Sequence, residues 1–96
     1  MTALIIPITD KISSADYYLD NLLWSIQTQE LDKQFSIYPC WDSCTDKFIE
    51  TFYHRYPFMV YDPKLINTGN PLRFSGNVNN GLRLVHSTTN HNVIVV

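Results

Sequence analysis

The chain has 96 residues, of which 45% are hydrophobic and only 17% are charged, and its formal net charge is −2. This length allows one domain, residues 1–96, and the seven Lys and Arg residues are scattered, which excludes a nucleic-acid backbone as the expected partner. So much apolar material exceeds what a small solvated monomer buries. We therefore expect some of it to face a partner chain or a missing remainder of the same chain. We also expect a homo-oligomer that associates through an exposed apolar sheet or helix surface.

Membrane and disulfide classes are also disfavoured. No segment reaches the roughly 18 consecutive apolar residues of a membrane-spanning helix, and the N-terminus lacks a signal-peptide pattern. We expect no membrane span and a cytoplasmic location. Cys40 and Cys44 are too few for a disulfide scaffold, and no second pair completes a zinc site. We expect free buried thiols and no metal ligands within the chain.

The first strand and helix follow from hydrophobic spacing. Residues 4–8 form a continuous apolar run, as in a strand buried on both faces. A helix is predicted from about residue 15 to about residue 29, because Leu and Ile recur there at helical spacing. Ser13 and Asp16 precede it with the spacing of a capping box.

The second half continues the alternation. Residues 34–40 predict a strand, and residues 45–55 predict a helix that ends at Tyr56-Pro57, because a residue before proline avoids the helical region. The buried face of this helix is predicted to carry Phe48, Ile49, Phe52 and Tyr53. A third strand at 58–61, a long connection at 62–76, a third helix at 77–86 and a fourth strand at 92–96 complete the order.

Alternating strands and helices predict an α/β fold. We expect about four mostly parallel strands and three helices in three layers, joined by right-handed crossovers. The last residue falls inside the fourth predicted strand, and natural domains seldom end there. The chain is therefore expected to be a truncated domain.

The hexapeptide Trp41-Asp42-Ser43-Cys44-Thr45-Asp46 joins the second strand to the second helix. Acidic and hydroxyl side chains at the carboxyl end of a parallel strand lie where open α/β sheets bind ligands. Asp42 is thus a candidate ligand residue, although an acid near a helix N-terminus also favours the helix dipole. Ser43 and Asp46 have the spacing of a capping box, so a structural role is expected for Asp46.

Several other short stretches of the chain form an ordered set of motifs together with the hexapeptide. Residues 4–10 read LIIPITD, and residues 19–29 have the pattern Leu-x-x-x-Leu-x-Ser-Ile-x-x-Gln. Asn67-x-Gly69 and Asn79-x-Gly81 follow the hexapeptide, and NVIVV comes last. Together they resemble the nucleotide-binding half of family 2 glycosyltransferases with the GT-A fold. The matched features are the first strand with its Pro-Thr-Tyr-Asn end, the first helix, the Asp-Asp-Gly-Ser-Thr-Asp loop, two Asn-x-Gly segments and the strand before the Asp-x-Asp.

The resemblance implies a Rossmann-like half of a GT-A fold that binds the nucleotide part of a nucleotide-diphosphate sugar. In the complete family site, an Asp-x-Asp holds Mg²⁺ or Mn²⁺, and a later base activates the acceptor. Neither group falls within this chain, so the resemblance implies no catalytic residue here and no activity of the chain alone. The implied nucleotide-binding residues are Pro7, Thr9, Asp10, Trp41, Asp42, Asn67, Gly69, Arg73 and Asn79.

The chain departs from the family pattern at several positions. Trp41 replaces the first aspartate of the loop, and Ser43 and Cys44 replace its glycine and serine. Asp10 stands where asparagine is usual. A tryptophan at this position would hold a base by stacking on its face. These changes affect which donor the chain accepts.

Each remaining candidate also fits a structural role. Asn67 and Gly69 fit either a pocket wall or a turn. Arg73 fits a diphosphate contact or a solvated loop. Asn79 and Gly81 fit close approach of a ligand or close packing of helix on sheet. The competing hypothesis for the whole chain is a non-enzymatic oligomeric interaction module built on the half-fold.

Overall fold

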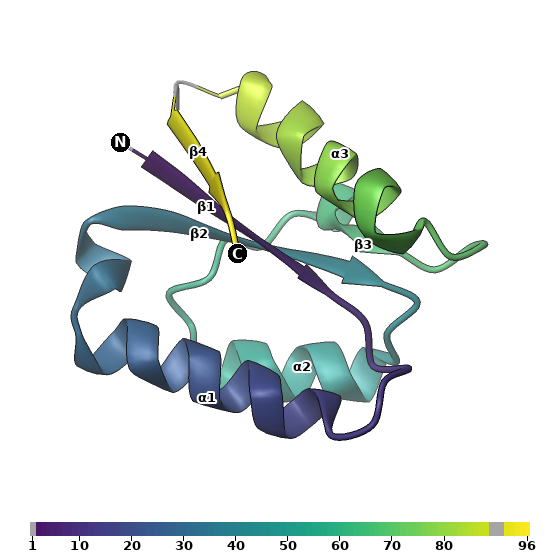
Figure 1. Ribbon diagram of the computed structural model, residues 1–96, viewed down its shortest axis with the longest axis horizontal. Helices are drawn as coiled ribbons and strands as arrows, with labels where there is room; N and C mark the ends of the chain where they lie inside the picture. The colour runs from purple at the N-terminus through teal and green to yellow at the C-terminus, as the bar shows by residue number, and fades with distance from the viewer. Residues whose placement is uncertain (1, 89–91) are drawn as a thin grey trace.

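The computed structural model describes residues 2–88 and 92–96. Within them, four strands form a parallel sheet in the order β3-β2-β1-β4. Helices α1 and α2 cover one face of this sheet, and α3 covers the other (Figure 1). This arrangement confirms the predicted α/β class with four parallel strands, three helices and three layers. The elements are β1 (Thr2–Ile8), α1 (Ala15–Thr28), β2 (Phe35–Asp42), α2 (Asp46–Arg55), β3 (Ile66–Asn67), α3 (Arg73–His86) and β4 (Asn92–Val95).

Side chains of the central strands alternate between the two helical layers. Ile5 of β1 and Cys40 of β2 lie under Gly81 of α3. On the opposite face, Trp41 packs against Tyr53 of α2. Consecutive residues at the end of β2 therefore point to different faces of the sheet, and this decides which of them can reach a site beside α3.

The helices bury the faces that their spacing predicts. Leu19, Leu23 and Ile26 of α1 are buried, as are Ile49 and Phe52 of α2. Together with β1 and β2 they form the larger part of the hydrophobic core. Among the described residues, no helix is long and apolar enough to cross a membrane.

The third strand differs from the prediction. Residues 57–59 form a turn, and the strand that pairs with β2 is the short Ile66–Asn67. The apolar run instead closes the end of the α2 layer: Met59 is buried, and the backbone of Val60 donates to Ile37 O at 2.8 Å. The Tyr53 hydroxyl donates to Val60 O at 2.7 Å. A short apolar run alone does not distinguish a strand from a buried turn.

Two predicted capping boxes are absent. Ser14, not Ser13, precedes α1, with φ of 60° and no side-chain cap. Thr45 caps α2, because its hydroxyl accepts from the backbone N–H of Phe48 at 3.2 Å. Asp46 is the first residue of α2, where its charge favours the helix dipole.

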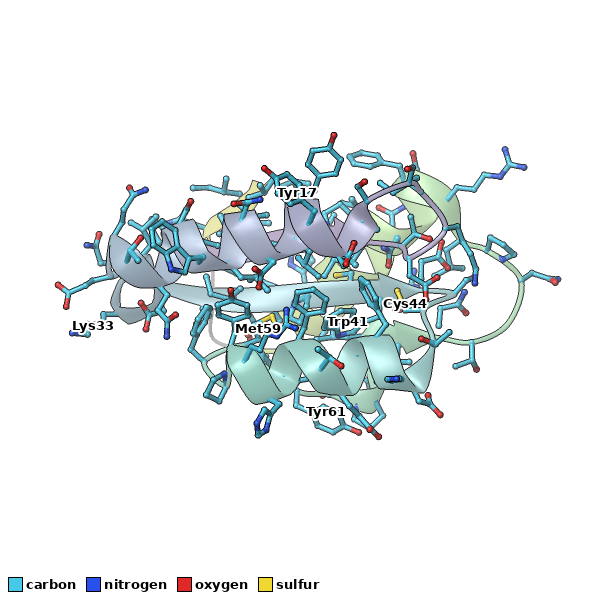
Figure 2. All side chains as sticks on the ribbon, turned by 90° about the horizontal axis from the view of Figure 1, so that it is seen from below. Tyr17, Lys33, Trp41, Cys44, Met59 and Tyr61 are labelled. Atoms are coloured by element: carbon cyan, nitrogen blue, oxygen red, sulfur yellow. The ribbon has the colours of Figure 1, made fainter. Side chains whose placement is uncertain are left out.

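Both cysteines are free and buried, as predicted. Burial raises the pKa of the Cys40 thiol to about 12 and, with the nearby charge of Asp10, that of Cys44 to about 12. In Figure 2, seen from below, Cys44 and Trp41 lie between α1 and α2. The two thiols therefore stay protonated and serve as apolar packing groups.

Candidate functional site

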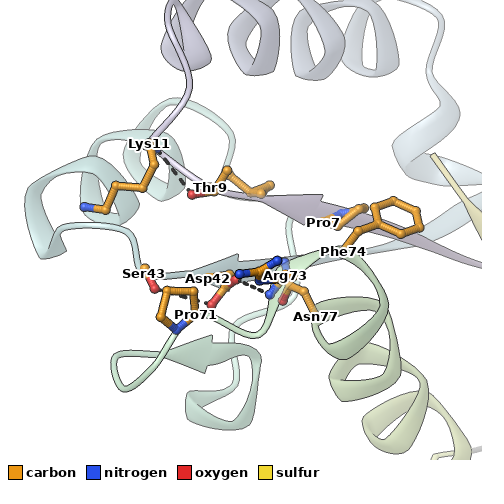
Figure 3. Close-up of a pocket in the computed structure, with 10 residues that line it drawn as sticks. Pro7, Thr9, Lys11, Asp42, Ser43, Pro71, Arg73, Phe74 and Asn77 are labelled. Carbon is orange, nitrogen blue, oxygen red and sulfur yellow. Dashed lines mark hydrogen bonds between the residues drawn. The ribbon is translucent and has the colours of Figure 1, made fainter.

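A pocket of about 380 Å³ lies at the carboxyl ends of β1 and β2, beside the first turn of α3 (Figure 3). Ligands of open α/β sheets bind at this end of the strands. Three segments line the pocket: the end of β1 with the loop after it, the end of β2, and the start of α3. Their residues are Pro7, Ile8, Thr9 and Lys11; Asp42 and Ser43; and Pro71, Arg73, Phe74 and Asn77.

Asp42 organises the wall formed by α3. Its Oδ2 accepts from the backbone N–H of Arg73 at 3.0 Å, and both of its carboxylate oxygens lie 3.0 Å from the backbone nitrogen of Leu72. The Asn67 amide donates to Oδ1 at 2.9 Å. Asp42, at the end of β2, thus accepts from backbone N–H groups at the start of α3 and caps this helix. This cap explains why α3 begins at Arg73 and not at residue 77 as predicted.

The Asp42 carboxylate is ionised and already well provided with donors. Burial by itself raises its pKa, but hydrogen bonds from Asn67, Leu72, Arg73 and Ser43 outweigh that effect and lower the pKa. A carboxylate offers about four lone-pair directions. Most of these are used within the chain, so Asp42 shapes the pocket more than it offers free acceptors to a ligand.

Two cationic side chains reach the pocket from opposite walls. Lys11 lies beyond the end of β1, and its Nζ is 3.2 Å from Asp10 Oδ1. Arg73 is exposed at the start of α3, and its guanidinium makes no ion pair within the described residues. The N-terminal end of α3 adds partial positive charge. Asp10 already pairs with Lys11, and the Asp42 carboxylate already occupies the start of α3. Within the described residues, Arg73 is therefore the pocket cation that stays available to a negatively charged group.

Apolar surface forms the rest of the wall. Pro7 and Ile8 lie at the end of β1, and Pro71 and Phe74 lie on the facing segment. Asn77 is buried, donates its amide N–H to Cys40 O at 2.7 Å, and leaves its Oδ1 without a hydrogen-bond partner. A mainly apolar cavity with a few charged groups at one side is typical of small-molecule sites.

Two of the four non-glycine residues with positive φ in the described part of the chain lie at this pocket, and the other two, Ser14 and Glu30, precede α1 and a short turn before β2. Ser43 has φ of 59° and Arg73 has φ of 62°, the left-handed region that favours glycine. Residues other than glycine held in this region cost about 1–3 kcal/mol and are common at functional sites. Both residues line the pocket.

Replacing Ser43 with glycine is expected to raise the free energy of unfolding by about 0.5–1 kcal/mol. Glycine removes the strain at φ of 59°, and the gain is reduced by its larger entropy in the unfolded chain. Urea denaturation measures the change. Ser25→Gly, inside α1, is the matched control and should lower stability by about 0.5 kcal/mol. A loss of stability in Ser43→Gly would contradict the strain.

Four of the implied nucleotide-binding residues line the pocket: Pro7, Thr9, Asp42 and Arg73. Asp10 instead faces α2, where its Oδ2 accepts from the backbone N–H of Thr45 at 2.8 Å. Although burial raises the pKa of Asp10, this hydrogen bond and Lys11 outweigh it and lower the pKa.

The other implied residues lie outside the pocket lining. Trp41 has no exposed surface, and its Nε1 donates to the Tyr53 hydroxyl at 3.2 Å, so its ring is not available for stacking on a base. Asn67 binds Asp42 and Asn70 O. Gly69 is exposed in the loop before α3, and Asn79 is exposed on α3 itself.

Several lining residues had little or no sequence signal. Lys11 comes just after the first strand and could have been noticed as a cation at a strand end. Ser43 lies within the hexapeptide. Pro71, Phe74 and Asn77 come into the pocket only because Asp42 starts α3 four residues earlier than its hydrophobic spacing predicts.

Neither a metal-binding cluster in the described residues nor a comparison with known proteins gives a further indication of function. In residues 2–88 and 92–96, no three His, Cys, Asp or Glu side chains gather where they would hold a metal ion. No protein family, curated protein or solved structure matches this chain. The functional conclusion rests on the geometry of the pocket and on the resemblance of the sequence stretches.

Proposed function

We propose that the chain is a glycosyltransferase-like domain half that binds the nucleotide part of a nucleotide-diphosphate sugar and does not transfer the sugar alone. The observation that carries the proposal is the pair of cations, Arg73 without an ion pair and Lys11 paired with Asp10, at an apolar pocket on the carboxyl ends of parallel strands. Arg and Lys bind phosphate oxygens, and the apolar wall suits a base. The volume of about 380 Å³ lies within the range of ligand pockets.

Backbone geometry supports the resemblance to family 2 glycosyltransferases. Ser43 stands where the family loop has glycine, and its φ of 59° lies in the region that favours glycine. Gly81 stands at the glycine of the second Asn-x-Gly, and a Cβ there would lie 2.5 Å from Cys40 Sγ. The backbone angle at residue 43 and the close packing at residue 81 each favour glycine, the residue that the family has at both positions.

The proposed binding uses side chains of this chain and no metal ion. The Mg²⁺ or Mn²⁺ of the complete family site needs carboxylate ligands. The described residues offer no such cluster, and Asp42 is engaged with α3. Lys11 and Arg73 would neutralise the diphosphate instead. The two free thiols suit a reducing compartment, so a cytoplasmic location is part of the proposal.

Calorimetry with uridine and guanosine diphosphates, with and without Mn²⁺, tests the proposal. We expect Arg73→Gln and Lys11→Gln each to weaken binding about tenfold, or 1.4 kcal/mol, because each removes one phosphate contact. Lys47→Gln, on α2 away from the pocket, is the control and should bind as the unaltered chain does. If neither nucleotide binds at millimolar concentration, donor binding is excluded for this chain. Equal weakening by the control would place any binding outside the pocket.

A second candidate function is self-association as a non-enzymatic interaction module. It is favoured by large apolar side chains that remain exposed on β4 and on α1: Ile94, Val95, Val96, Tyr17, Tyr18 and Trp24. We propose a homo-oligomer on this basis, whether or not a nucleotide binds. Light scattering over a range of concentrations tests it, because a constant monomer mass of 11.2 kDa would exclude it.

A further inference from the structure

β4 is an open edge of the sheet. It pairs with β1 on one side and has no strand on the other within the described residues. The Val96 N–H donates to Ile5 O at 2.9 Å, toward β1. Because backbone groups alternate along a parallel strand, the N–H and C=O groups of Val93 and Val95 point to the open side. These groups are free to pair with another strand.

This edge lacks the features that normally prevent strand pairing. The residues of β4, and Val96 after it, include no charged side chain, no proline and no glycine. Ile94 is 47% exposed and Val95 is 42% exposed, although they point to opposite faces of the sheet. The other edge differs, because β3 has two residues and directly follows the Pro63–Leu65 turn with its lysine. Pairing with a further strand is therefore favoured at β4.

Apolar side chains are also exposed on α1, the helix on the side of the sheet to which Ile94 points. Ile94 is in register with Leu4, whose neighbour Ile5 faces α3, so Ile94 faces the α1 side of the sheet. Tyr17 and Tyr18 are exposed on α1 with their rings 5.7 Å apart. Figure 2 shows Tyr17 on the flank of α1 away from α2, the same flank beyond which β4 lies. We call Ile94, Val96, Tyr17 and Tyr18 the β4–α1 surface.

We propose that a second copy of this chain pairs with β4 in antiparallel orientation, about a two-fold axis perpendicular to the sheet. The inference rests on the proposed self-association and names its surface. Such an axis brings the Val93 and Val95 backbone groups of the two copies together in one continuous sheet. It keeps both α1 helices on the same face, so that the β4–α1 surfaces of the two copies meet. The contact uses the same patch twice, and it closes at two copies.

The lack of charge on β4 and the area that a stable interface needs both favour a second copy of this chain at β4. No charged residue lies in β4, so the two-fold axis brings no like charges together along the strand. Stable interfaces bury about 1,200–2,000 Å² in total, which a strand of four residues does not reach alone. The tyrosines of α1 supply the additional apolar contact, and aromatic residues of this kind dominate interface energetics.

Chromatography with light scattering on the 96-residue chain tests the inference. The unaltered chain is expected to form a dimer, and Val95→Pro is expected to be a monomer. Proline removes the outward N–H of Val95 but no hydrogen bond to β1. Ile94→Lys is the second variant, because it places like charges at the contact. Tyr61→Lys is the matched control and should stay dimeric, since Tyr61 is exposed beyond α2, on the side opposite β4 (Figure 2).

The possible outcomes distinguish a failure of the β4 contact from a failure of self-association in general. A monomeric unaltered chain overturns both. A dimer that persists in Val95→Pro and Ile94→Lys keeps self-association and overturns the β4 contact, and a mass above the dimer overturns the closed two-fold arrangement. Circular dichroism checks folding, and Ile94→Lys decides if Val95→Pro does not fold. Hydrogen exchange adds a readout without mutation, because the Val93 and Val95 amides should be protected and should lose protection on dilution.

Discussion

Replacing Asp42 with alanine is expected to lower the free energy of unfolding by about 3 kcal/mol. The change removes the acceptor for the backbone N–H groups of Leu72 and Arg73 and for the Asn67 amide. Hydrogen bonds to a charged group contribute about 1.5–3 kcal/mol each, and water recovers part of the loss because Arg73 is exposed. Urea denaturation measures the effect. Asp46→Ala, an exposed acid in the first turn of α2, is the control and should cost at most about 1 kcal/mol.

The same interaction predicts a pH dependence. The folded pKa of Asp42 lies below the unfolded value of about 3.9, so its contribution is fully present above the unfolded pKa. That contribution is lost as the pH falls through the folded pKa. The stability difference between the unaltered chain and Asp42→Asn should therefore be constant near neutral pH and should shrink below about pH 4. A difference that grows as the pH falls below the unfolded pKa would contradict an ionised cap.

Loss of Asp42 also displaces the wall of the proposed binding site. Arg73 owes its position at the pocket to the capped start of α3. Weak nucleotide binding by Asp42→Ala would therefore not separate a direct contact from a displaced Arg73. For this reason the binding test uses Arg73→Gln and Lys11→Gln, which leave the cap in place.

Periodicity was sufficient to predict the layers and insufficient to predict the connections. The apolar runs of β1, β2 and β4 and the spacing of α1 and α2 are local signals, and each element formed close to its predicted bounds. The start of α3 depends on a carboxylate about 30 residues earlier in the chain. Hydrogen bonds across such a separation leave no periodic pattern in the sequence. The third predicted strand was wrong for a similar reason, since Val60 is held by Ile37 and Tyr53 from distant elements.

The candidate site was partly predictable from the same signals. The strand ends pointed to Pro7, Thr9 and Asp42, and these three residues line the pocket. The same signals predicted a ligand role for both Trp41 and Asp42, because a sequence motif does not show which face of the sheet a side chain occupies. Side chains alternate along β2, so these two neighbours point to opposite faces. Trp41 is consequently a core residue, whereas Asp42 lies at the pocket.

Replacing Gly81 with alanine is expected to lower the free energy of unfolding by about 2 kcal/mol. The new Cβ would lie 2.5 Å from Cys40 Sγ and 3.3 Å from Ile5 Cγ2, where α3 packs on the sheet. Overpacking of this kind costs about 1–3 kcal/mol, and this contact is close enough to exceed the gain of about 1 kcal/mol in helix propensity. Asn79→Ala, exposed on the same helix, is the control for propensity and should be slightly stabilising. Urea denaturation measures both variants.

The contact with Cys40 can be tested separately because its Sγ is the nearest atom. In a chain that already carries Cys40→Ala, the added Cβ of Gly81→Ala meets no sulfur, and the propensity gain should make the change neutral or stabilising. The two substitutions would then couple by about 2 kcal/mol, which is typical of residues in direct contact. Additive effects would mean that α3 lies farther from β2 than the structure has it. In that case the wall of the pocket at Asn77, which binds Cys40 O one turn earlier on α3, would also be displaced.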